Sequence, residues 1–194
     1  MICIYQKAAF LALLALAGRP AWAQTVLVTR HAQLSFFSAT PLENISAKSS
    51  SAVSAIDTKS RTIYFKVDNT SFEFPRKLME EHFNENYIES SKYPFSEFHG
   101  QVAEPVDLTK DGTYPVTVTG KLKIHGVEKA YSEQGVITLK DQKLRVTASF
   151  NVQLKDHNIA IPTMVVAKIA EQVKVTVSAE YELKTQALLP QPKL

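Results

Sequence analysis

The stretch KLRVTASFNVQL, residues 143–154, alternates apolar and polar side chains over its whole length. The even-numbered positions from Leu144 to Leu154 are apolar, and the odd-numbered positions from Lys143 to Gln153 are polar or charged. Successive side chains leave opposite faces of a β-strand, so this alternation predicts a strand with one buried and one solvated face.

The same alternation recurs in VKVTVSAEYELK (173–184), in YPVTVTGKLKIHG (114–126) and, over a shorter length, in TIYFKV (62–67). Long strands with one polar face are typical of antiparallel sheets that have one face in water. We therefore predict an all-β chain. Its strands near 115–125, 129–139 and 143–154 should form a consecutive meander, to which 173–184 returns.

Weaker alternation predicts three earlier strands, near 30–40, 43–56 and 61–72. The connections agree with a meander, because KDGTYP (110–115) and IHGVEK (124–129) carry glycine at turn positions and LKDQKL (139–144) is a polar break. Two segments do not alternate and predict short helices between strands. PRKLMEEHFNENY (75–87) has apolar residues at helical spacing, and so has IPTMVVAKIAEQ (161–172).

A one-faced sheet of eight or nine strands must bury its apolar face, either by closing into a barrel or by stacking on a second sheet. The alternation alone leaves both architectures open. In a barrel of about eight strands, side chains can fill the interior, or the interior can hold one small ligand.

The first 23 residues carry the features of a secretory signal peptide. Lys7 precedes the apolar run AAFLALLALAG, and Ala21-Trp22-Ala23 places small residues where signal peptidase reads them. The apolar run is too short to span a bilayer. We therefore expect cleavage before Gln24 and a soluble, exported, periplasmic product without stable membrane insertion.

Removal of this segment changes the composition of the remaining 171 residues. The sole cysteine, Cys3, leaves with it, which excludes disulfides, thiolate ligands and cysteine nucleophiles. Lys7 and Arg19 leave as well, so the formal charge falls by two, from +3 to +1. Such a charge gives no case for a nucleic-acid partner.

Candidate catalytic and metal sites are weak. His82, Glu85 and His99 lie in one short segment, but no strong zinc spacing joins them, so a metal-dependent, hydrolase-like site is only an alternative. The adjacent Asp156 and His157 fit a turn that leaves a strand better than a catalytic pair. No Gly-x-Ser-x-Gly motif or glycine-rich phosphate loop occurs. We expect no enzyme activity and no cofactor, which leaves binding or protein contacts.

Three sequence pieces together resemble the YceI-like family of exported bacterial proteins. They are KYPFSEFHG (92–100), the pattern V-x-G-x-L-x-I-x-G from Val118 to Gly126, and D-x-x-I-x-x-P from Asp156 to Pro162. The resemblance covers roughly residues 32–184. It implies an extended, lipocalin-like antiparallel β-barrel with two short helices, which encloses a long apolar or amphiphilic ligand such as an isoprenoid, a quinone or a fatty amide.

The resemblance also implies which side chains bind the lipid. The interior contacts are expected from Phe36, Phe65, Phe72, Phe74, Val118, Ile124, Val146, Phe150, Val175 and Val177. Further contacts near the mouth are expected from Met79, Phe83, Phe95, Phe98, Ile161 and Met164. The acidic segment EEHFNENYIESSKYP (80–94) departs from the more basic pattern of isoprenoid binders. This departure weighs against a pyrophosphate head group and favours a neutral ligand.

The resulting domain plan has three parts: a signal peptide at 1–23, a YceI-like lipid-binding barrel at 24–185 and a flexible C-terminal tail at 186–194. The expected partner is an isoprenoid-like or other long-chain lipid. The sequence leaves a homodimer open, and it also leaves open a ligand-free β-domain that acts through protein contacts.

Overall fold

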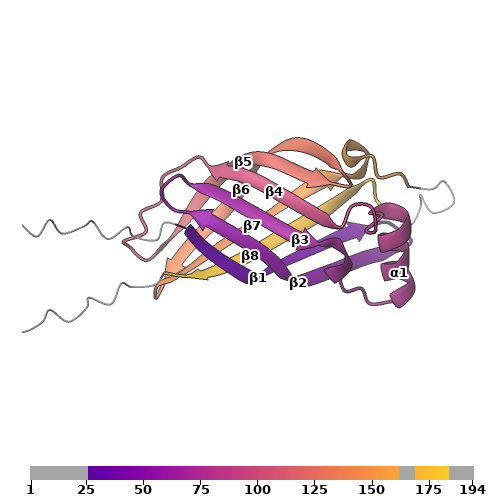
Figure 1. The fold of residues 1–194 in the computed structure, drawn as a ribbon, viewed down its shortest axis with the longest axis horizontal. Helices are drawn as coiled ribbons and strands as arrows, with labels where there is room; N and C mark the ends of the chain where they lie inside the picture. Colours follow the sequence, from indigo (N-terminus) through magenta and orange to yellow (C-terminus); the bar gives the residue numbers. More distant parts are fainter. Residues whose placement is uncertain (1–25, 162–168, 184–194) are drawn as a thin grey trace, which may run out of the picture.

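Eight antiparallel strands follow one another around a closed barrel in the computed structural model of the chain, which describes residues 26–161 and 169–183 (Figure 1). The strands are β1 (Val26–Ala39), β2 (Asn44–Asp57), β3 (Thr62–Asp68), β4 (Phe95–Val102), β5 (Gly112–Ile124), β6 (Val127–Lys140), β7 (Lys143–Gln153) and β8 (Gln172–Glu182). β8 pairs with β1 and closes the barrel. The prediction of an antiparallel barrel is confirmed, and the stacked-sheet alternative is excluded.

Tight two-residue turns set the register of the meander. His125 and Gly126 join β5 to β6, and Asp141 and Gln142 join β6 to β7; all four residues have positive φ. Two consecutive residues with positive φ are typical of the type I′ turn, whose twist matches that of the flanking strands. The predicted turn at 110–115 is partly wrong, because β5 already begins at Gly112.

The predicted helix at 75–87 is confirmed in outline. It consists of α1 (Lys77–His82) and a π-helical turn, η2 (Phe83–Tyr87), and it covers one end of the barrel (Figure 1). The predicted strand at 61–72 ends early, at Asp68, because Asn69–Ser71 form a 3-10 turn, η1. No helix in the described ranges is long and apolar enough to cross a bilayer.

The second predicted helix, at 161–172, falls largely on residues 162–168, which lie outside the described residues. Its last residue, Gln172, already belongs to β8. The remaining 3-10 turn, η3 (Leu154–His157), directly follows β7. The predicted turn at Asp156 and His157 is thereby confirmed.

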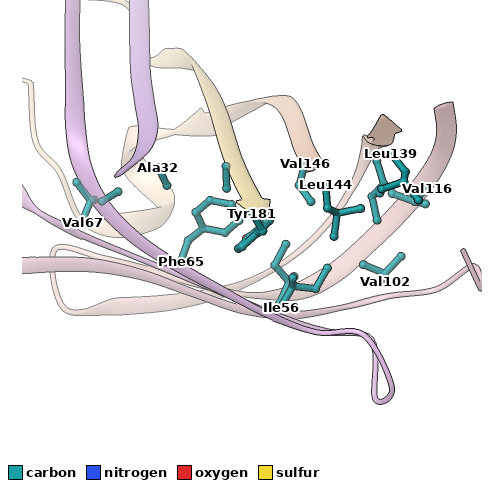
Figure 2. Packing of buried hydrophobic residues seen from close by; sticks show 14 of the residues in the cluster. Ala32, Ile56, Phe65, Val67, Val102, Val116, Leu139, Leu144, Val146 and Tyr181 are labelled. Atoms are coloured by element: carbon teal, nitrogen blue, oxygen red, sulfur yellow. The ribbon is translucent and has the colours of Figure 1, made fainter. Parts of the chain in front are cut away.

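Part of the hydrophobic core fills the half of the barrel that lies away from α1. Ile56, Val102, Leu139 and Leu144 come from strand ends beside the β2–β3, β4–β5 and β6–β7 connections, and all are buried. Figure 2 shows these aliphatic side chains as parts of one cluster with Phe65 and Tyr181. A core at one end closes the barrel there, so any interior space must lie in the other half.

Candidate functional site: an apolar cavity in the barrel

The half of the barrel next to α1 is hollow. A cavity of about 460 Å³ is lined by inward side chains of β1 to β8, and by residues of α1 and η2. Its wall is almost wholly apolar, with a few polar groups. This volume and composition match those of typical small-molecule pockets, and the mouth of a barrel is a common place for one.

Most of the sequence-predicted ligand contacts lie on the wall of this cavity. Thirteen of the sixteen line it: Phe36, Phe65, Phe72, Phe74, Met79, Phe83, Phe98, Val118, Ile124, Val146, Phe150, Val175 and Val177. The strand alternation explains this agreement, because each of these strand residues belongs to the apolar face that the sequence pattern defined. That these residues bind a ligand stays a prediction.

Phe95 was expected near the mouth, and this placement is wrong. Its side chain is 42% exposed on the outside of the barrel, with Lys66 Nζ 3.7 Å from the ring centroid. Phe95 and Phe98 are three residues apart in β4, so they leave opposite faces of the strand. Ile161 is half-buried but does not line the cavity, and Met164 lies outside the described residues.

Four phenylalanines form an aromatic cluster at the α1 end of the cavity. Phe36 of β1 stacks on Phe83 of η2 with ring centroids 5.5 Å apart, and Phe72 and Phe74 contact both rings at 5.1–5.8 Å. Offset and edge-to-face aromatic pairs stabilise a packed arrangement beyond their buried area. The cluster therefore fixes the helical segment against the barrel and forms one wall of the cavity.

Two glycines make room for the ring of Phe98. Gly100 of β4 pairs with Gly120 of β5. A Cβ atom at Gly100 would lie 2.5 Å from the Phe98 ring, and one at Gly120 would lie 2.7 Å from it. Because neither glycine has a side chain, the ring can lie flat against the wall instead of projecting into the cavity.

The His82, Glu85 and His99 metal site is not formed. His82 lines the cavity, whereas His99 lies on the outer face of β4, with its ring centroid 4.4 Å from that of Tyr64. Within residues 26–161 and 169–183, no group of three His, Cys, Asp or Glu side chains is close enough to hold a metal ion. The alternation of β4 separates the two histidines, which sequence proximity alone could not show.

His157 is a structural residue with two fixed hydrogen bonds. The side chain is fully buried in η3, where Nδ1 lies 3.1 Å from the Val127 carbonyl oxygen and Nε2 lies 3.1 Å from the Tyr131 hydroxyl. Burial holds the pKa of the imidazole below its ordinary value. These bonds tie η3 to β6 at the end of the barrel that α1 covers.

The sequence interpretation missed two polar residues of the cavity wall, Tyr131 and Glu133. Both lie on β6 and line the cavity. The first half of this strand, VEKAYSEQ, lacks a clear apolar alternation. Counting back in steps of two from the buried Ile137 would have placed both side chains on the inward face.

An up-and-down antiparallel barrel with one packed half and one hollow, apolar half has the architecture of a lipocalin-like barrel. The sequence adds the family: the model of the YceI-like domain matches residues 25–181, and the chain belongs to this family. No curated protein sequence matches the chain.

Solved structures show the same fold. A polyisoprenoid-binding domain from Saccharophagus degradans, implicated in plant cell wall breakdown, superimposes with a TM-score of 0.69 at 17% identity, covering 81% of this chain and 98% of that one. BcnA of Burkholderia cenocepacia gives a TM-score of 0.63 at 15% identity, with 76% and 96% covered. The YceI protein of Campylobacter jejuni gives 0.55 at 18% identity, with 70% and 81% covered. At these identities the likeness concerns the fold.

Proposed function

We propose that this chain is a periplasmic carrier that encloses a long-chain apolar or amphiphilic ligand in its barrel. The observation that carries the proposal is the apolar cavity of about 460 Å³ in a barrel whose other half is packed. Burial of apolar ligand surface contributes about 25 cal/mol per Å², so a lipid chain gains most from such a wall. The name of the Saccharophagus degradans domain supports an isoprenoid as one ligand class.

The alternative of a ligand-free domain that acts through protein contacts is less favoured by the interior. Protein interiors are normally packed to the density of organic crystals, with few voids larger than a water molecule. A domain with no ligand has no need of so large a void. The proposal assigns no chemical step to the cavity, whose wall is almost wholly apolar.

The periplasmic location rests on the signal-peptide features of residues 1–23. Expression of the full chain in a bacterium with an outer membrane, followed by fractionation, tests it. We expect the protein in the periplasmic fraction, with the mass of a chain that begins at Gln24. A full-length product in the cytoplasmic fraction would contradict the location.

Ligand uptake tests the carrier function itself. Protein that has been unfolded, extracted with organic solvent and refolded would be titrated calorimetrically with geranylgeraniol, a 20-carbon isoprenoid alcohol. We expect saturable binding of one molecule per barrel with a negative heat-capacity change, because apolar surface is buried. No binding of this lipid or of a straight-chain fatty amide would contradict the proposal.

A further inference from the structure

Two polar side chains of the cavity wall, Tyr131 and Glu133, lie where the pairing of β6 with β7 ends. The hydrogen-bonded register between these strands runs from Lys140–Lys143 to Gly135–Ala148 and stops there, although both strands continue. Tyr131 and Glu133 lie on the part of β6 beyond this point and face inward. Beyond this point β6 stays paired with β5 but not with β7 in the hydrogen-bonded register.

The hydroxyl of Tyr131 already donates its hydrogen to a protein acceptor, His157 Nε2. The Val127 carbonyl can only accept a hydrogen bond, so His157 Nδ1 carries the proton that occupies it. In the neutral imidazole, which burial favours, Nε2 then has no hydrogen and accepts one from the Tyr131 hydroxyl. The Tyr131 oxygen therefore keeps acceptor capacity and has no hydrogen left to donate.

Glu133 adds a second acceptor on the same inward face. It pairs with Val118 of β5, whose side chain also lines the cavity, and it is half-buried. Among the residues that the structure describes, its carboxylate has no hydrogen-bond or ion-pair partner. A carboxylate beside apolar surface is costly unless a donor meets it, so a bound ligand that offers a donor is favoured.

The cationic side chains of Lys66 and Arg76 on the cavity wall are already paired with acids. Arg76 forms an ion pair with Glu43, and Lys66 Nζ lies 3.4 Å from Glu97. An anionic head group near Glu133 would therefore be repelled by the carboxylate. Among the described residues of the wall, no unpaired lysine or arginine would offset this repulsion. A donor head group would meet two acceptors.

We infer that Tyr131 and Glu133 select lipids whose polar end is a hydrogen-bond donor, a hydroxyl, amide N–H or ammonium group, over lipids with a phosphate or an acceptor-only end. This inference rests on the proposed carrier function and adds the class of head group. It places the polar end of the ligand against the β6 wall inside the barrel, with the apolar chain along the remaining strands.

Three ligands that share one 20-carbon chain test the inference: geranylgeraniol, its methyl ether and its monophosphate. For the delipidated wild-type protein, we expect the alcohol to bind at least about tenfold more tightly than either of the others, since a hydrogen bond to a charged group supplies about that factor. Equal affinity for all three would overturn the inference and leave the carrier function standing. No binding of any of them would overturn both.

Variants at position 133 assign the effect to its carboxylate. Glu133→Leu should lose most of the preference for the alcohol over the ether, and Glu133→Gln should bind the monophosphate more tightly than the wild type does. Ser132→Leu is the matched control, because Ser132 lies next in the strand on the exposed outer face. If both Glu133 variants kept the wild-type preferences among the alcohol, the ether and the monophosphate, the inference would be overturned. The comparison of head groups in the wild type does not depend on how well the variants fold.

Discussion

The hydroxyl of Tyr181 on β8 hydrogen-bonds to Ser54 Oγ on β2, at 2.6 Å, in the interior of the barrel. Ser54 Oγ in turn donates to the Tyr64 carbonyl oxygen at 2.8 Å, so the Tyr181 hydroxyl is the donor of the first bond. Both side chains are buried. This bond joins strands that are not neighbours and ties together the packed half of the barrel, below the cavity.

Tyr181→Phe should therefore destabilise the fold without affecting the cavity. Without the Tyr181 hydroxyl, the buried Ser54 hydroxyl accepts no hydrogen bond. This loss lowers the free energy of unfolding, measured in urea at pH 7, by about 1–2 kcal/mol.

Burial also raises the pKa of Tyr181 to about 12. Unfolded tyrosine ionises near pH 10, so the stability contributed by the neutral hydroxyl is complete below pH 10 and falls by up to about 2–3 kcal/mol towards pH 12.

The variant should lose less stability than the wild type over that interval. Tyr64, whose pKa is also raised to about 12 by burial and by its hydrogen bond to Glu97, is present in both proteins, so the difference between the two curves reports Tyr181. Parallel curves from pH 9 to 12 would show that Tyr181 does not carry the alkaline transition.

His157→Gln should change the acid side of the stability curve. The pKa of His157 is lowered mainly by burial, so the unfolded chain takes up a proton below about pH 6.5 before the folded protein does. The stability tied to the neutral imidazole is complete above pH 6.5 and declines as the pH falls below it. The variant should lose about 2 kcal/mol at pH 7, with a flatter decline between pH 7 and 5. An unchanged slope would contradict this role.

Gly100→Ala should force the Phe98 ring off the wall. The new Cβ would lie 2.5 Å from that ring and 2.8 Å from the Thr119 carbonyl oxygen, an overpacking that costs about 1–3 kcal/mol. Lipid uptake should weaken as well, because the displaced ring takes up cavity space. The same substitution in a Phe98→Leu background should cost less. Equal costs in both backgrounds, measured by urea unfolding, would show that the ring is not what Gly100 accommodates.

Filling the cavity should abolish binding while the barrel remains folded. Ala148 lines the cavity on β7, and the void of about 460 Å³ leaves room for a phenyl ring. We expect Ala148→Phe to keep the wild-type circular dichroism spectrum and to lose at least about tenfold in affinity for geranylgeraniol. Ser149→Phe, next in the strand on the exposed face, is the control and should bind as the wild type does. Equal affinity of both variants would place the ligand elsewhere.

Much of the barrel could be predicted from sequence because the period-two pattern is a direct readout of which side of a strand faces inward. The inward set predicted from Leu144 to Leu154 is correct residue by residue, over β7 and the first residue of η3. Phe95 shows what goes wrong when residue type is considered without the strand alternation. It was expected to face inward with Phe98, although side chains three residues apart in a strand point to opposite faces.

The division of the interior into a packed and a hollow half could not be read from the sequence. Val116 and Val118 are successive inward residues of the same type on β5, yet Val116 is part of the buried core and Val118 lines the cavity. Whether an inward residue is packed or lines the cavity depends on which side chains from distant strands, such as Tyr181, reach across the barrel to it. Tyr131 and Glu133 were missed for a related reason, because a polar residue that faces inward has the pattern of an outward one.

Native mass spectrometry of the protein purified from a bacterial periplasm without detergent tests the carrier function most directly. We expect a stoichiometric adduct of a few hundred daltons that is removed by organic extraction, is absent from Ala148→Phe and is retained by Ser149→Phe. A clean apo mass for the wild type, with no adduct after incubation with geranylgeraniol or a fatty amide, would contradict the central claim that this barrel encloses a lipid.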